Sequence, residues 1–180
     1  MSKVPKTKPP TRTELSAKPA TPFCTKGTII SVDPSIGSSA SMPGYSIVVD
    51  GKMVDSGILQ INHRDPSNKR LGDIQAQLRK LVPSPNVLVC EAIAPMLSVG
   101  GPNVIQLHWA VGVTQATYPD AISVLIPNMV WKSHLKKAGL DKYHKSDEHD
   151  AIALMWTLFS LCDAKFKNEK DIRAELLTPT

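Results

Sequence analysis

Apolar residues along this chain form short runs separated by polar, Gly-rich and Pro-rich stretches, and the spacing within each run predicts an element. The first run, "TIISVD" at 28–33, is rich in β-branched residues and is stopped by Pro34, a pattern typical of a buried strand. Two further apolar runs flank Asp50-Gly51, a dipeptide strongly associated with two-residue hairpin turns. We therefore expect one strand followed by an antiparallel hairpin.

The remainder of the chain predicts strands connected by helices. Leu71, Ile74, Leu78 and Leu81 recur at helical spacing in a helix that starts near Asn68, and prolines follow it. The further expected elements are a strand at 87–91, a helix at 103–117, a strand at 121–127, and helices at 128–140 and 147–162. The order β-β-β-α-β-α-β-α predicts an α/β fold, with a five-stranded mixed sheet whose first three strands are antiparallel and which is flanked by helices.

The charge of the chain divides it into parts. The net charge is +5, and residues 1–26 hold six basic residues and one acidic residue, so that 6 − 1 = +5, while the remainder is balanced. Many prolines and few large apolar side chains predict that 1–26 is a basic disordered arm. Such an arm either contacts phosphates or only keeps the chain soluble. We expect one folded domain at 27–162 and a helical or flexible C-terminal tail at 163–180.

Composition also argues against several classes of protein. No stretch reaches the roughly 20 apolar residues of a membrane span, and the start of the chain lacks a secretory signal, so a cytoplasmic protein without membrane contact is expected. The three cysteines are far apart without a C-x-x-C pair, and the histidines show no paired spacing with them, which disfavours a zinc site.

Acidic residues stand at the ends of two predicted strands. Asp33 follows a mostly apolar run and Glu91 follows "VLVC". Asp33 with Pro34 could simply begin a turn. Glu91 has no obvious turn role, and a buried charge is costly unless it is paired or binds a metal. Ligands gather beyond the carboxyl ends of strands in parallel α/β folds, so both acids lie where a site is expected.

The last apolar helix opens with "SDEHDAIAL", which adds more acids. Asp147 and Asp150 are three residues apart and therefore share one helical face, although acids at a helix start also favour the helix itself. Several carboxylates without cysteine favour a hard cation such as Mg²⁺ or Mn²⁺. Two such ions about 3.5–4 Å apart would activate water and stabilise the leaving oxygen in phosphodiester hydrolysis.

The acids in "ISVDPS", "VLVCEAI" and "SDEHDAIAL" resemble, in order and spacing, the catalytic pattern of RuvC-type Holliday junction resolvases, which have the RNase H-like fold of the retroviral integrase superfamily. The predicted order of elements matches that fold. The segment "NVIQLHWAVGVTQA" is similar to the family helix that follows the second acid. The resemblance spans about 28–162 and implies a divergent member, such as one from a bacteriophage.

The resemblance assigns catalytic and metal-binding roles to four acids, Asp33, Glu91, Asp147 and Asp150. Asp33 would bridge two Mg²⁺ ions, for which Mn²⁺ can substitute, and Glu91 would be the second ligand. Asp150 matches the family's helix start, whereas Asp147 competes with Glu148 and His149 for the fourth place.

The resemblance further implies a homodimer that resolves four-way DNA junctions by paired, symmetric nicks, since two cuts require two sites related by two-fold symmetry. The helix that carries Val104, Leu107, Trp109 and Val111 either supplies part of the interface or is ordinary core. Predicted DNA contacts come from five lysines that precede the last acids, Lys132, Lys136, Lys137, Lys142 and Lys145. Two other functions stay open, a branched-DNA-binding module without catalysis and a general debranching or flap nuclease.

Overall fold

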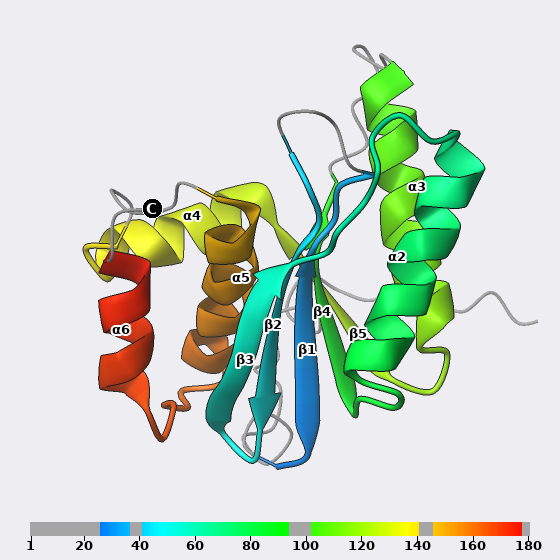
Figure 1. Cartoon of the computed structure of the whole chain (residues 1–180). Coiled ribbons are helices and arrows are strands. Elements are labelled where there is room, and N and C mark those ends of the chain that lie inside the picture. Colours follow the sequence, from blue (N-terminus) through cyan, green and yellow to red (C-terminus); the bar gives the residue numbers. More distant parts are fainter. Residues whose placement is uncertain (1–25, 37–40, 94–101, 141–145, 178–180) are drawn as a thin grey trace, which may run out of the picture.

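The computed structural model describes residues 26–36, 41–93, 102–140 and 146–177, and they form a sheet with helices on both faces (Figure 1). The elements are β1 (Thr28–Asp33), β2 (Gly44–Val49), β3 (Lys52–Ile58), α2 (Ser67–Leu81), β4 (Val87–Ala92), α3 (Pro102–Thr117), β5 (Ile122–Pro127), α4 (Asn128–Lys137), α5 (Asp147–Leu161) and α6 (Glu169–Leu177). The five strands lie in the order β3-β2-β1-β4-β5. β1 to β3 pair antiparallel, and β4 and β5 run parallel to β1, which confirms the predicted mixed sheet.

The turn between β2 and β3 has the predicted hairpin geometry. Asp50 and Gly51 have φ angles of 49° and 80°, and positive values at both central residues define a type I′ turn. Asp50 also accepts a hydrogen bond from the Gly27 N–H through Oδ1 at 2.9 Å. This second contact ties the start of β1 to the hairpin.

Side chains of the central strands alternate between two apolar clusters. Val32 of β1 and Cys90 of β4 are register partners and lie in the cluster that includes Leu78 of α2. Ile29 and Val89, by contrast, lie in the cluster that includes most of α5. The sheet is therefore covered by α2 on one face and by α5 on the other, and each strand position has a defined face.

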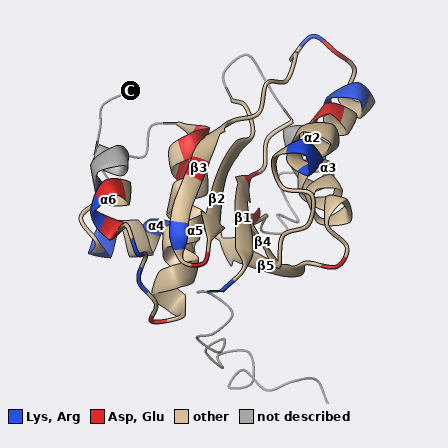
Figure 2. Ribbon diagram, turned by 60° about the horizontal axis from the view of Figure 1, so that its bottom comes forward, with Lys and Arg blue, Asp and Glu red and all other residues tan. Residues whose placement is uncertain are grey.

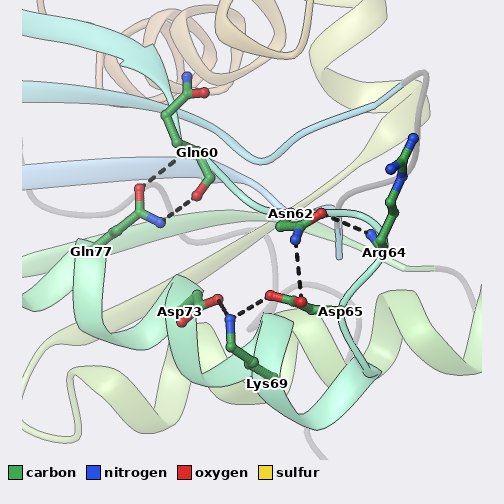
Figure 3. A network of polar contacts seen from close by, with 7 residues as sticks. All are labelled: Gln60, Asn62, Arg64, Asp65, Lys69, Asp73 and Gln77. Carbon is green, nitrogen blue, oxygen red and sulfur yellow. Dashed lines mark hydrogen bonds and ion pairs between the residues drawn. The ribbon is translucent and has the colours of Figure 1, made fainter.

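The connection from β3 to α2 is held by polar contacts on the α2 face (Figure 3). The Gln60 N–H donates to Gln77 Oε1 at 2.9 Å, and Gln77 Nε2 donates back to the Gln60 carbonyl at 2.8 Å. Lys69 forms ion pairs with Asp65 and Asp73, each four residues away. Exposed pairs of this kind contribute little to stability because water screens them, so they order the start of α2 more than they stabilise the fold.

Helix α4 ends three residues earlier than its sequence predicts. The helix was expected to reach Leu140, but Gly139 has a φ of 71° and its N–H donates to the Lys136 carbonyl at 3.0 Å. The Leu140 N–H then donates to the Leu135 carbonyl at 2.9 Å, and the Leu140 side chain is buried. This pair of bonds is a Schellman cap, in which glycine reverses the chain.

The C-terminal segment packs against the α5 face of the sheet. The rings of Phe166 and Phe159 stack with centroids 4.0 Å apart, and Ile172 of α6 is buried. Asn168 accepts from the Met53 N–H at 3.0 Å and donates to the Met53 carbonyl at 3.1 Å, so its amide occupies the outer edge of β3. The described part of 163–180, which includes α6, is thus joined to the core and covers part of the edge of β3.

Some sequence predictions fall outside the described residues. They concern the basic arm up to residue 25 and two of the predicted DNA-binding lysines, Lys142 and Lys145. Within the described ranges, no helix is long and apolar enough to cross a membrane.

Candidate active site

The two strand-end acids lie on the same face of the sheet. Val32 and Cys90 are paired across β1 and β4 and both face α2. Because side chains alternate along a strand, Asp33 and Glu91, each one residue further on, face the side of α5. The parallel pairing of β1 and β4 also brings their carboxyl ends to the same edge of the sheet.

The first turn of α5 brings the other acids to this edge. Ser146 is the N-cap, and its Oγ accepts a hydrogen bond from the His149 N–H at 3.2 Å. Asp147, Glu148 and Asp150 all lie in the first helical turn, which Figure 2 shows as an acidic end of α5. The position of the start of α5 therefore determines which of its acids lie close to Asp33 and Glu91.

Small residues beneath α5 allow its first turns to approach β1 and β2 closely. Ser31 and Ser46 are fully buried and share a hydrogen bond of 2.7 Å, and Ser31 also donates to the Ala151 carbonyl at 2.5 Å. A Cβ atom on Gly44 would lie 1.9 Å from the Asp147 carbonyl oxygen, well inside the contact limit. Only a glycine at this position lets the helix start lie against β2.

The pKa of Asp33 is affected by the other three predicted acids, which shows that the four lie near one another. Burial, followed by the negative charges of Asp150, Glu91 and Asp147, raises the pKa of Asp33 from 3.8 to about 8. Lys132 acts in the opposite direction and lowers the pKa of Asp33. With this pKa, Asp33 holds its proton at neutral pH, because burial and the neighbouring acids both disfavour its charged form.

Asp147 and Glu91 are each held by two donors. Asp147 Oδ2 accepts from the Met42 N–H at 2.7 Å, and its Oδ1 accepts from the Ser41 hydroxyl at 3.2 Å. Glu91 Oε1 accepts from Asn128 Nδ2 at 3.0 Å, and its Oε2 accepts from Trp131 Nε1 at 3.2 Å. These donors orient both carboxylates, and an ionised carboxylate still has acceptor sites left for a cation.

The two competitors of Asp147 lie in other surroundings. Glu148 accepts from the Ser56 hydroxyl of β3 at 2.7 Å and borders a hollow of about 290 Å³ that Asp55 and Asp171 also line. The His149 side chain is 3% exposed. Of these neighbouring residues, Asp147 is the one whose charge acts on Asp33.

The donor chemistry of the cluster fits a hard divalent cation. Its side chains are carboxylates, and a bound cation would oppose both causes of the raised pKa of Asp33, which are burial and then the neighbouring negative charges. Within the described residues, no three His, Cys, Asp or Glu side chains already stand as a metal-binding set. Binding of an ion would therefore have to draw some of these carboxylates closer to one another.

Helix α4 carries three of the predicted DNA-binding lysines. Lys132, Lys136 and Lys137 are exposed, and the Lys132 amine lies 5.0 Å from the centroid of the Trp131 ring. Its effect on Asp33 places Lys132 within electrostatic reach of the cluster. The remaining two predicted lysines are outside the described residues.

Sequence reasoning missed the residues that hold the acids in place. The Gly-rich and Ser-rich sequence around Gly44 predicts only a loop, and Met42 acts through its backbone N–H, which leaves no signal in the sequence. Asn128 and Trp131 were read only as parts of a helix. One signal was present, because Ser31, Gly44 and Ser46 are small residues on a single face of two strands that are rich in β-branched residues.

The order of strands, their directions and the helices on both faces define an α/β protein with the RNase H-like fold, as the sequence predicts. Among solved structures, the chain is similar to Thermus thermophilus RuvC in complex with a Holliday junction substrate, with a TM-score of 0.55 and 16% identity over 74% of this chain and 94% of that chain. A second structure of RuvC from the same organism has a TM-score of 0.47 and 16% identity over 82% of this chain and 89% of that chain. No protein-family model and no curated protein matches the sequence.

Proposed function

We propose that this protein is a Mg²⁺-dependent endonuclease that cuts branched DNA, with the four-way junction as its preferred substrate. The convergence of Asp33 with Asp150, Glu91 and Asp147 at one sheet edge carries the proposal. A set of carboxylates on a half-exposed surface suits hydrolysis of phosphodiesters assisted by a hard cation. The similarity to RuvC, solved with a Holliday junction substrate, supports the choice of DNA.

In this proposal Asp33, Glu91, Asp147 and Asp150 would hold the cation through their carboxylate oxygens. The charges of the other three acids already act on Asp33. Bound Mg²⁺ would supply the charge that activates water and stabilises the leaving oxygen. Mn²⁺ has the same ligand preference and would substitute.

The Asp33 carboxyl group has to lose a proton before it binds a cation. Its pKa of about 8 keeps it protonated at neutral pH, and ion binding requires the carboxylate form. Binding of Mg²⁺ therefore releases about one proton at pH 7 and tightens as the pH rises toward 8. Lys132, whose charge favours the carboxylate, assists this ionisation.

The exposed lysines of α4 would hold the DNA backbone. Lys136 and Lys137 lie in the last turn of α4, and Lys132 lies nearer the acids. Lysines contact phosphates without reading sequence, so they would position a strand while the acids act on one of its phosphodiesters. Lys142 and Lys145 remain predicted contacts from the sequence.

Paired nicks need two active sites, and we propose that a homodimer supplies them. Trp109 and Ile105 are four residues apart on α3 and are 51% and 50% exposed. Val111, which was predicted beside Trp109, is instead buried. Two large apolar side chains on one exposed helical face are a suitable centre for contact with a second copy.

The test is cleavage of a synthetic four-way junction beside linear duplex, flap and fork substrates of the same sequence, in Mg²⁺ and in EDTA. We expect Mg²⁺-dependent nicks placed symmetrically on the junction, with much slower cutting of the other substrates. Equal cutting of every branched form would instead identify a general debranching nuclease. Tight junction binding without cutting in Mg²⁺ or Mn²⁺ would identify a non-catalytic binding module.

A further inference from the structure

Trp131 is the largest fully buried side chain of the described core, at 1% exposure, and its indole is polar at one atom. Buried tryptophan N–H groups normally find an acceptor, because an unsatisfied donor costs about 1–3 kcal/mol. Trp131 Nε1 donates to Glu91 Oε2, a carboxylate oxygen of the candidate site. This hydrogen bond links a side chain of the apolar core to the candidate site.

Asn128 makes the matching contact on the same helix. It is the first residue of α4, three positions before Trp131, so both side chains lie on one helical face. Asn128 Nδ2 donates to Glu91 Oε1 at 3.0 Å, and thus each oxygen of the carboxylate has its own donor from α4. Two fixed donors leave the carboxylate little freedom to rotate.

Both donors are neutral, and this distinguishes them from an ion pair. A Lys or Arg partner would cancel the charge of Glu91, whereas an amide and an indole orient the carboxylate and leave its negative charge available. The cation on this helix, Lys132, lies instead over the face of the Trp131 ring. A ring face attracts a cation, so Trp131 contacts an acid through its edge and a base through its face.

We propose that Asn128 and Trp131 are positioning residues that fix the Glu91 carboxylate for a divalent cation, and that Trp131 also seats Lys132 beside the acids. The role of Glu91 as a cation ligand rests on the proposed function. The positions of the donors are independent of it, and donors of this kind commonly change metal affinity or activity by 10–100-fold when removed.

The first measurement follows the indole N–H signals of the three tryptophans by NMR during a Mg²⁺ titration without DNA. We expect a saturable shift of the Trp131 signal, because its acceptor binds the ion. The signals of Trp109 and Trp156 are internal controls that should stay in place. The Trp131→Phe and Trp156→Phe variants assign the signals.

The second measurement is the Mg²⁺ concentration that gives half-maximal junction cleavage. Trp131→Phe and Asn128→Ala each remove one donor, and we expect each to raise this concentration roughly tenfold or more. Trp156→Phe is the matched control, because its ring contacts Phe166 and Arg173, and it should leave the concentration unchanged. A variant that is merely destabilised would lower the amount of active protein without moving the Mg²⁺ dependence.

The outcomes separate this inference from the proposed function. The positioning role alone would be overturned if the enzyme cuts junctions, the Trp131 signal does not shift with Mg²⁺, and the Trp131→Phe and Asn128→Ala variants need the same Mg²⁺ concentration as Trp156→Phe. A Trp131 shift in a protein that cuts no branched DNA would support the positioning role and overturn the nuclease. A protein in which Mg²⁺ neither shifts the Trp131 signal nor supports cleavage of branched DNA would overturn both the positioning role and the nuclease.

Discussion

Asp33 is an aspartate whose surroundings raise its pKa to about 8. It ends a strand whose other residues are apolar or small, and it faces three carboxylates from β4 and α5. Burial alone disfavours its ionised form, and the surrounding charges add to that effect. The fold thus tolerates an unfavourable carboxylate at this point, as expected where a cation or substrate compensates for it.

This unfavourable carboxylate predicts how stability depends on pH without metal. Between pH 4 and pH 8 the folded protein keeps a proton on Asp33 that the unfolded chain has lost, so the free energy of unfolding falls as the pH rises through this range. Asp33→Asn removes the effect. In EDTA at pH 8 we expect the variant to be more stable than the wild type by about 2 kcal/mol or more, with the difference shrinking toward pH 4.

Thermal unfolding in EDTA from pH 4 to pH 8 measures this difference. Wild type and Asp33→Asn should show melting temperatures that diverge as the pH rises. Parallel curves for the two proteins would mean that Asp33 titrates normally. Addition of Mg²⁺ at pH 8 should stabilise the wild type and leave the variant nearly unchanged.

Helix α5 carries two of the acids, and the site depends on how closely its start approaches the sheet. Gly44 and the two buried serines, Ser31 and Ser46, have small side chains that leave room for its first turns against the sheet. The Ser41 hydroxyl and the Met42 N–H then hold the Asp147 carboxylate from the side of the β1–β2 connection. The helix start is thereby fixed at its backbone and at its first side chain.

Gly44→Ala should disturb this arrangement. The added methyl group would meet the Asp147 carbonyl at 1.9 Å and must displace the start of α5. We expect a loss of roughly 1–3 kcal/mol of stability and a larger loss of Mg²⁺-dependent activity in the protein that remains folded. Gly72→Ala is the control, since a Cβ there has no neighbour within 4 Å on an exposed part of α2.

Denaturant unfolding and cleavage rates of both alanine variants test whether the close contact between Gly44 and the start of α5 is needed. Gly72→Ala should be neutral or stabilising by up to about 1 kcal/mol, because alanine favours a helix. Equal behaviour of Gly44→Ala and Gly72→Ala would show that α5 does not depend on close contact with β2.

Elements could be predicted because their signals are local, and their mutual contacts could not. The alternation in "TIISVD", the turn at Asp50-Gly51 and the helical spacing around Ile74 each lie within a few residues, and the structure has these elements at the predicted places. The donors to Glu91 and Asp147 lie 37 to 106 residues away in the chain. No short-range pattern specifies such pairs.

At the scale of the whole molecule, the exposed apolar residues are unevenly placed. Trp109 and Ile105 of α3 form one pair, whereas the outer edge of β3 is covered in part by Asn168. An edge that is already capped is a poor place for a second copy to add a strand. The proposed homodimer therefore uses α3 rather than β3.

Trp109→Glu should convert the dimer into a monomer, because it places a charge at the centre of an apolar contact. Val54→Glu is a matched control on β3, since Val54 is 53% exposed and Trp109 is 51% exposed. Light scattering coupled to size-exclusion chromatography distinguishes the two states. A Trp109→Glu protein that stays dimeric would place the interface elsewhere.

The most direct test of the central claim is single-turnover cleavage of a four-way junction in Mg²⁺ by five isosteric variants. Four remove the charges of the proposed site, Asp33→Asn, Glu91→Gln, Asp147→Asn and Asp150→Asn, and the fifth, Glu148→Gln, removes the neighbouring charge that bonds to Ser56. We predict that the first four lose about 10²-fold or more in rate while junction binding persists, and that Glu148→Gln cuts at close to the wild-type rate. Full activity in Asp33→Asn, or equal losses in Glu148→Gln and Asp147→Asn, would contradict the account.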